Sequence, residues 1–255
     1  MRLFPRSAAL DTLVRMTNKI NTCEGGKYDE QVATGYDAVR EKERHWWLED
    51  EFVRKYFLTH PVKSLLDLPV GTGRFFRHYR GVENLTGVDI SEHMLAEAQR
   101  KVDQLPQATR VTLEKGDVFA LKYPDRSFDA VIVWRLLHLL SPDVLPGAIK
   151  ELCRVTRGQL IVQTYPRPHK GHRFWNRLGL KLGWRRLPPH LLAEPQTPRH
   201  DPQIAKAWCH IPAYYHRQGL FDRLFTEEGC KRKEVRFLDE YKGCDVRVAI
   251  YQQTR

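Results

Sequence analysis

The sequence predicts an α/β fold in which a doubly wound, seven-stranded and mostly parallel sheet has an antiparallel last strand and a lid inserted after the fifth strand. Three observations support this prediction. Short apolar runs alternate with helical stretches between residues 63 and 165, two of these runs end in an acid, and a short turn joins the last two runs. Because strands that alternate with helices pair in parallel, helices are expected on both faces of the sheet.

Five strands are expected in the first two thirds of the chain, at residues 63–68, 84–89, 109–115, 128–134 and 158–165. Helical patterns separate some of them, over Ser91 to Leu105 and Val144 to Val155. The two last apolar runs, 234–238 and 245–251, are separated by a turn around Gly243. Because this turn is too short for a crossover connection, the two runs are expected to form an antiparallel hairpin.

The N-terminal part of the chain is expected to be mostly helical. A helix is expected at about residues 8–20, a break at Gly25-Gly26, and mostly helix again from Tyr28 to Leu58. Charged side chains interrupt the first apolar stretches at Asp11, Arg15 and Lys19. Neither a signal peptide nor a membrane-spanning helix is therefore expected.

The most informative stretch is L-L-D-L-P-V-G-T-G-R-F, from Leu65 to Phe75. An apolar run ends at Asp67 and passes through two glycines into an expected helix, an arrangement in which the backbone approaches a nucleotide cofactor closely. A second apolar strand ends at Asp89, the spacing expected for an acceptor of ribose hydroxyls. The dinucleotide fingerprint of dehydrogenases needs a third glycine, and Phe76 stands in its place.

These motifs resemble those of the class I S-adenosylmethionine-dependent methyltransferases, especially the group that contains quinone-biosynthesis and other small-molecule enzymes. The resemblance covers residues 28 to 165, and includes the helix Ser91 to Ala98 and the segment Leu136 to Leu140. It implies a Rossmann-like sheet, S-adenosylmethionine as the cofactor and a methyltransferase activity.

One position departs from the pattern of the family. The family usually has glycine where this chain has Pro69. Proline fixes φ and has no N–H, but it keeps the carbonyl that this position presents to the amino group of the cofactor in the family. The departure leaves room for an altered loop, and it is the sole support for a non-catalytic subunit that only binds a partner.

The resemblance also implies which residues bind the cofactor. Asp67 is expected at the methionine amino group, Asp89 at the ribose and Ile90 on the adenine. Trp134 or Arg135 is expected beside the methionine. The full set of expected cofactor-binding residues is Asp67, Pro69, Gly71, Gly73, Asp89, Ile90, Met94, Asp117, Val118 and Trp134. Upstream residues of the same group often fold over the cofactor, and the candidates are Tyr28, Tyr36, Arg44 and Trp47.

The chain of 255 residues, 42% of them hydrophobic, suffices for one large domain. Its expected parts are an N-terminal helical segment over the cofactor site (1–60), a cofactor-binding core (61–165), a basic lid (166–210) and a C-terminal helix with the strand hairpin (211–255). The cysteines lack C-x-x-C spacing, which favours reduced thiols in a cytoplasmic protein over a disulfide framework or a zinc site, and no metal is expected. They are Cys23, Cys153, Cys209, Cys230 and Cys244.

The net charge of +11 is concentrated in one part of the chain. Residues 166–236 hold fifteen Lys and Arg against six Asp and Glu, and Pro166 to Ala193 holds seven basic side chains and no acid. A negative partner is therefore expected, although a solvated basic loop is the alternative. The segment is long for a connection, and its interleaved aromatic residues would suit packing on the domain, a substrate cover or contact with an anionic membrane surface.

Methyl transfer needs an acceptor held in line with the methyl group, and a base helps where the acceptor must lose a proton. The candidate catalytic residues are His138, Tyr165 and His216, with His210 as a further histidine after the lid; a structural role for His138 is the alternative. The candidate substrate-binding residues are Arg173, Arg177, Tyr214 and Tyr215.

Three functions fit these observations. The first is a methyltransferase for a small acidic metabolite or a lipid- or sugar-linked precursor. The second is an RNA methyltransferase, because Tyr214-Tyr215-His216 faintly resembles tRNA wobble-uridine methyltransferases and a basic lid suits phosphates. The third is the non-catalytic binding subunit.

Overall fold

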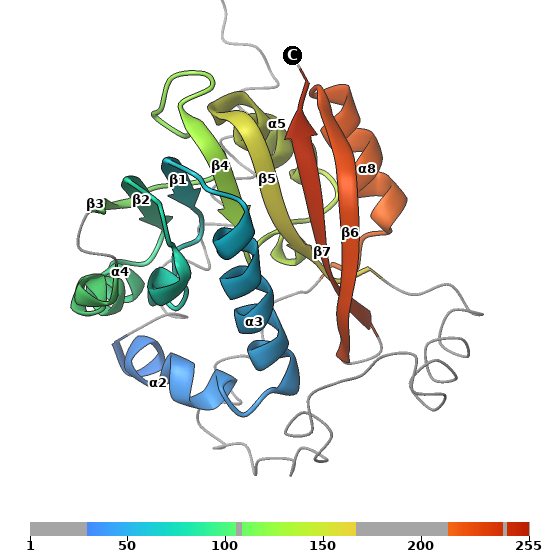
Figure 1. Ribbon diagram of the computed structural model, residues 1–255. Helices are drawn as coiled ribbons and strands as arrows, with labels where there is room; N and C mark the ends of the chain where they lie inside the picture. The colour runs from blue at the N-terminus through green and yellow to red at the C-terminus, as the bar shows by residue number, and fades with distance from the viewer. Residues whose placement is uncertain (1–29, 106–108, 167–213, 242–243, 255) are drawn as a thin grey trace, which may run out of the picture.

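The computed structural model describes residues 30–105, 109–166, 214–241 and 244–254. Their strands form one seven-stranded sheet in the order β3-β2-β1-β4-β5-β7-β6 (Figure 1). The strands are β1 (Ser64–Asp67), β2 (Asn84–Asp89), β3 (Arg110–Lys115), β4 (Phe128–Val133), β5 (Thr156–Thr164), β6 (Cys230–Tyr241) and β7 (Cys244–Gln253). Strands β1 to β5 pair in parallel, and β7 is antiparallel to both β5 and β6. The predicted fold class is confirmed, while the expected lid lies outside the described residues.

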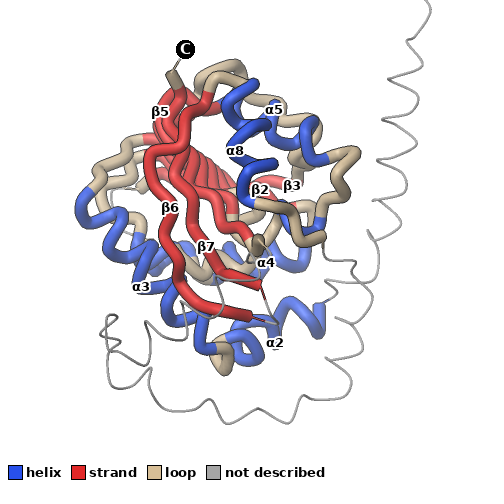
Figure 2. The backbone as a smooth tube through the Cα atoms, turned by 90° about the vertical axis from the view of Figure 1, so that its right-hand side faces the viewer, coloured by secondary structure: helices blue, strands red, loops and turns tan. Residues whose placement is uncertain are grey.

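Helices cover both faces of this sheet. They are α2 (Glu30–Arg40), α3 (Arg44–Thr59), α4 (Glu92–Arg100), α5 (Leu145–Val155) and α8 (Gln218–Glu227). Figure 2 views the molecule after a quarter turn and has α3 on one side of the sheet and α5 with α8 on the other. In the described part of the chain, no helix has the length and apolar character needed to cross a membrane.

Two apolar clusters hold these layers together. Side chains of α5 and α8 pack on one face of the sheet around Leu66, Val131 and Leu160. Side chains of α3 and of the segment after β1 pack on the other face around Leu65 and Ile132. Neighbouring residues on one strand, such as Leu65 and Leu66, thus belong to opposite clusters, as the alternation of side chains along a strand requires.

The helix expected directly after the glycines was wrong. In its place the chain makes turns and a single turn of 3-10 helix at Phe76–His78. Gly71 and Gly73 have φ values of +54° and +69°, in the left-handed region. The backbone after β1 is therefore not in the right-handed conformation that a helix needs at these two residues. Tyr79 then returns to the sheet, where its hydroxyl donates a hydrogen bond to Asp67.

Candidate active site

The candidate site lies at the carboxyl ends of β1, β2 and β4. Asp67, the last residue of β1, is in register with Gly87 of β2 and with Ile132 of β4. Asp89 is the last residue of β2. In parallel α/β sheets, ligands bind outside the carboxyl ends of the strands where the strand order reverses. Here β1 is paired with both β2 and β4, which places that reversal at Asp67.

Two backbone groups orient the carboxylate of Asp89. Its Oδ2 accepts a hydrogen bond from the Gly71 N–H at 2.9 Å, and its Oδ1 accepts one from the Ser91 N–H at 2.9 Å. Burial raises the pKa of Asp89 to about 6, although these backbone donors act to lower it. The carboxylate is therefore ionised at neutral pH and fixed against the loop after β1 that contains Gly71, Gly73 and Arg74, called the glycine loop below.

Asp67 is buried more deeply than Asp89. Its side chain is buried, and its Oδ2 accepts the hydrogen bond from the Tyr79 hydroxyl at 2.5 Å. Burial raises the pKa of Asp67 to about 7; the Tyr79 hydrogen bond opposes this rise and the nearby charge of Asp89 adds to it. The protonation of Asp67 is therefore sensitive to any cation that binds beside it.

The glycine loop requires glycine for two different reasons. A Cβ at Gly73 would stand 2.6 Å from the Phe76 ring, and its φ of +69° strains any other residue. A Cβ at Gly71 would meet nothing within 4 Å, so only its φ of +54° favours glycine there.

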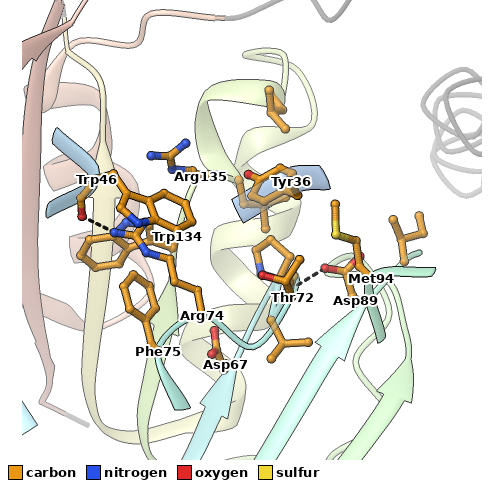
Figure 3. A pocket seen from close by; sticks show the side chains of 16 residues that line it. Tyr36, Trp46, Asp67, Thr72, Arg74, Phe75, Asp89, Met94, Trp134 and Arg135 are labelled. Atoms are coloured by element: carbon orange, nitrogen blue, oxygen red, sulfur yellow. Dashed lines mark hydrogen bonds between the residues drawn. The ribbon is translucent and has the colours of Figure 1, made fainter. Parts of the chain in front are cut away.

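The pocket above these strand ends has a cavity volume of about 170 Å³ and is partly open to solvent. Figure 3 shows two ends: Asp89 and Met94 at one, and Trp46, Arg74 and Trp134 at the other. The lining is formed by Tyr36, Trp46, Asp67, Pro69, Val70, Gly71, Thr72, Arg74, Phe75, Asp89, Ile90, Met94, Trp134, Arg135, Leu136 and Leu139. The Ile90 side chain is 40% exposed, an unusual exposure that offers an apolar surface to a flat ligand group.

The structure brings most of the expected cofactor-binding residues together. Those that line the pocket are Asp67, Pro69, Gly71, Asp89, Ile90, Met94 and Trp134. Gly73, Asp117 and Val118 are not among its lining residues. Val118 instead packs in the core, and Asp117 accepts a hydrogen bond from the Phe119 N–H at 3.0 Å. The adenine contacts expected of Asp117 and Val118 stay predictions.

Of the upstream candidates, Tyr36 alone lines the pocket among those that the structure describes. The Nε of Arg44 lies 3.8 Å from the Oδ2 of Asp239 in β6. Trp47 is 47% exposed, and its ring N–H donates to the Glu41 carbonyl. Tyr28 lies outside the described residues, as do His210, Arg173 and Arg177.

Two of the candidate catalytic residues, His138 and Tyr165, lie side by side but are not among the lining residues of the pocket. The rings of His138 and Tyr165 lie 4.7 Å apart, while the pocket itself is lined by the neighbours Leu136 and Leu139. Burial lowers the pKa of His138 to about 3 and raises that of Tyr165 well above its usual range. Both side chains are therefore neutral at neutral pH, and His138 would be a weak base in this conformation. Their catalytic roles stay predictions.

His216, Tyr214 and Tyr215 precede α8. The Nε2 of His216 lies 2.8 Å from the Leu140 carbonyl, which identifies the tautomer that carries a proton on Nε2. The Tyr214 N–H donates to the His138 carbonyl at 2.7 Å, and Tyr215 packs against the small cluster around Tyr165. These contacts anchor the segment before α8 to the wall that carries His138.

Sequence reasoning missed an ionic cluster at the opposite end from Asp89. Glu49 of α3 is fully buried and is shared by Arg74 of the glycine loop, at 2.7 Å, and Arg135 after β4, at 3.1 Å. Gln163 of β5 also donates to Glu49. Burial acts to raise the pKa of Glu49, but Arg135 and Arg74 lower it to about 2. No local signal marks this cluster, because Arg74 and Arg135 lie 25 and 86 residues from Glu49.

Metal binding has no support in this region. Within the ranges that the structure describes, His, Cys, Asp and Glu side chains form no group of three suited to hold a metal ion. The cluster around Glu49 is instead an alternation of carboxylates and guanidiniums.

A mostly parallel sheet with a glycine loop after β1 and an acid at the end of β2 defines a protein that binds an adenosine-containing cofactor. A methyltransferase-domain family matches residues 65–159. Phosphatidylethanolamine N-methyltransferase from Cereibacter sphaeroides is 30% identical over 142 residues, which cover 51% of this chain and 70% of that protein. The chain belongs to the class I S-adenosylmethionine-dependent methyltransferases, whose cofactor is S-adenosylmethionine.

The chain is also similar to other methyltransferases. Demethylmenaquinone methyltransferase from Symbiobacterium thermophilum is 28% identical over 137 residues, which are 50% of this chain and about half, 53%, of that protein's length. The fold is also similar to 1,6-didemethyltoxoflavin-N1-methyltransferase from Burkholderia thailandensis, with a TM-score of 0.56 and 14% identity over all of this chain and 94% of that one. Magnesium protoporphyrin IX methyltransferase from Synechocystis has a TM-score of 0.53 and 16% identity, over 87% of this chain and 84% of that one.

The residues present fit S-adenosylmethionine. Asp89 offers a fixed carboxylate for hydroxyl groups, and Ile90 with Met94 offers an apolar surface for a base. At the other end, Asp67 can accept from an ammonium group. The Trp134 ring N–H, which is buried and has no hydrogen-bond partner in the described part of the chain, is available to an acceptor there.

Proposed function

We propose that this chain transfers a methyl group from S-adenosylmethionine to a small molecule, and that the acceptor is acidic or linked to a lipid or a sugar. The observation that carries the proposal is the pocket itself, with the carboxylate of Asp89 held against the glycine loop at one end and the aromatic rings of Trp46 and Trp134 beside Arg74 at the other. The relatives named above support a small acceptor, since their names refer to a menaquinone precursor and to phosphatidylethanolamine.

The chain's own residues would contribute mainly by binding and orientation. The cofactor supplies a methyl group activated on a sulfonium. Asp89, Ile90 and the glycine loop would fix its adenosine part, while Asp67 and Trp134 would fix its amino-acid part. Leu136, Leu139 and Phe75 also line the pocket, where they would exclude water from the acceptor. Holding the acceptor in line with the methyl group then provides much of the rate.

A proton from the acceptor would leave through water or through His138. The buried imidazole of His138 is neutral, and its Nδ1 has no hydrogen-bond partner among the described residues. Its pKa of about 3 makes it a poor proton acceptor until an anionic or polar ligand raises that pKa. The cytoplasm, where this cofactor and reduced thiols occur together, is the location that we propose.

Transfer of label from methyl-labelled S-adenosylmethionine tests this proposal. The purified protein is incubated with a metabolite extract and, separately, with total tRNA. We expect label in the metabolite fraction, with little effect of added salt. An RNA acceptor would instead give label in tRNA, with an affinity that falls by about 0.7 log units per neutralised phosphate for each log unit of salt. Cofactor binding without label in either fraction would favour the non-catalytic subunit.

A further inference from the structure

Arg135 stands at the pocket in an unusual backbone conformation. It is the second residue after the end of β4, has a φ of +55° and lines the pocket. This left-handed region is unfavourable for a residue with a side chain. Non-glycine residues in such conformations are concentrated at binding and active sites, where the surrounding structure stabilises the strained backbone.

The guanidinium of Arg135 is buried but poorly bonded. Its side chain is 13% exposed, its Nη1 lies 3.4 Å from Glu43 and its Nη2 lies 3.1 Å from Glu49. Charge-assisted hydrogen bonds of this kind are usually about 2.7–2.9 Å long. Its Nε is buried and has no hydrogen-bond partner within the described ranges. Arg135 therefore has donor capacity to spare.

Arg74, which lines the same end of the pocket, is bound more tightly. Its Nη1 donates to Glu49 at 2.7 Å, its Nη2 donates to the Trp46 carbonyl, and its guanidinium carbon lies 3.3 Å from the centre of the Trp46 ring. These contacts fix Arg74 as part of the wall (Figure 3). The Arg74 Nε, like that of Arg135, is buried and has no hydrogen-bond partner in the described part of the chain. Its 2.7 Å contact with Glu49 nevertheless holds Arg74 more firmly than Arg135, whose shortest carboxylate contact is 3.1 Å.

The charged groups around Arg135 alternate in sign. Arg40, Arg74 and Arg135 face the two carboxylates of Glu43 and Glu49, with Arg40 held by Glu43 at 2.7 Å. Burial acts to raise the pKa of Glu43, but its contacts with His45, Arg40 and Arg135 hold that pKa well below its usual range. Both carboxylates are ionised at neutral pH, and Asp50 adds a third carboxylate, 3.9 Å from the Arg74 Nε. Arg40 and Arg74 each have a carboxylate contact of 2.7 Å, whereas the carboxylate contacts of Arg135 are 3.1 and 3.4 Å long. Arg135 is therefore the arginine that this cluster holds least firmly.

The rest of this end of the pocket is flat and apolar. The lining residues nearest in sequence to Arg135 are Trp134 and Leu136, and Trp46, Leu139 and Phe75 add further apolar surface. The Trp134 and Phe75 rings lie 5.3 Å apart at a steep angle. Such walls suit an unsaturated or aromatic body with a single charged group.

We propose that Arg135 binds the carboxylate of the methyl acceptor, and that this acceptor is a carboxylic acid with a flat, apolar body. The inference rests on the proposed function, because it assigns the acceptor class of the same pocket. The planar guanidinium matches a carboxylate, which it can bind through two parallel hydrogen bonds.

Benzoate and its neutral analogue benzamide test this assignment. Their affinities are measured by ligand-observed NMR titration of the full chain, alone and saturated with S-adenosylhomocysteine. We expect wild-type protein to bind benzoate at least tenfold more tightly than benzamide. Arg135→Gln should abolish this preference, whereas Arg157→Gln should retain it, since Arg157 is an exposed residue paired with Asp129 on the sheet.

Several results would overturn the assignment. Equal binding of benzoate and benzamide to wild-type protein would do so, as would benzoate binding that Arg135→Gln leaves unchanged. The methionine part of the cofactor also carries a carboxylate, which is the alternative ligand for Arg135. If Arg135→Gln weakens S-adenosylmethionine tenfold but leaves decarboxylated S-adenosylmethionine unaffected, Arg135 binds the cofactor and the assignment is wrong. Failure of the protein to bind either cofactor form would refute the proposed function and not the carboxylate preference, which is measured without cofactor too.

Glu43→Gln provides a second variant if Arg135→Gln does not fold. It removes a carboxylate that competes for Arg135, so benzoate should bind severalfold more tightly while benzamide is unchanged. Unchanged or weaker benzoate binding by a folded Glu43→Gln protein would contradict the proposal.

Discussion

Replacement of Asp89 by asparagine should separate cofactor binding from folding. The change keeps the shape of the side chain and removes the charge that accepts from Gly71 and Ser91. Loss of a charge-assisted hydrogen bond to a ribose hydroxyl costs about 1.5–3 kcal/mol, so the affinity for S-adenosylmethionine should fall about tenfold to a hundredfold.

The stability of the cofactor-free protein should not fall. Burial raises the pKa of Asp89 from its ordinary 3.8 to about 6, so above pH 6 the ionised carboxylate disfavours the folded state. The contribution is about 1.4 kcal/mol for each pKa unit, which asparagine removes at pH 7.5. One backbone hydrogen bond is lost in exchange, at about 1 kcal/mol. The melting temperature of Asp89→Asn should therefore equal or exceed that of wild-type protein.

Calorimetry with S-adenosylmethionine and thermal melts at pH 7.5 measure both effects. Asp143→Asn is the matched control, because Asp143 is exposed and lies away from the pocket lining. A folded Asp89→Asn protein with wild-type affinity would refute the assignment of Asp89 to the ribose. A large loss of stability together with the loss of binding would show that the pair of backbone hydrogen bonds matters more than the charge.

Three further predictions follow from the same geometry. Gly73→Ala should lower the free energy of unfolding by about 2–4 kcal/mol, because alanine would add both left-handed backbone strain and a clash with Phe76. Gly71→Ala should lower it by only about 1–2 kcal/mol, because only the backbone strain applies there. Equal losses for the two variants in urea denaturation would contradict this reasoning. Glu49→Gln leaves Arg74 and Arg135 without their shared carboxylate and should cost about 3–5 kcal/mol, against less than about 1 kcal/mol for the exposed Glu51→Gln. The affinity for S-adenosylmethionine should fall as the pH drops below about 7, because Asp67 and then Asp89 become protonated; a flat pH profile in calorimetry would refute their roles as acceptors.

The sheet was predictable because each strand carries its own local signal. The predicted strands at 84–89 and 128–134 agree within one residue with β2 and β4, since apolar runs bounded by turn residues fix both ends. The hairpin of β6 and β7 followed from its short turn. The prediction of a helix after Gly73 was wrong because the apolar periodicity of the sequence carries no information on the positive φ values of the two glycines.

The pocket was predictable at one end only. Asp89 and Ile90 follow from a motif within one βαβ unit, whose spacing the sequence displays directly. The other end depends on Glu49, Arg74 and Arg135, which come from α3, the glycine loop and the end of β4. Single charged residues of this kind ordinarily indicate solvent-exposed surface, and only the three-dimensional packing of α3 over the strand ends turns them into a buried cluster.

Native mass spectrometry of the purified chain with S-adenosylmethionine tests most directly whether the pocket at the strand ends is the cofactor site. We expect one cofactor for each chain, competition by S-adenosylhomocysteine, loss of the complex in Asp89→Asn and its retention in Asp143→Asn. A complex that Asp89→Asn retains in full, or wild-type protein that forms no complex at millimolar cofactor, would contradict this expectation.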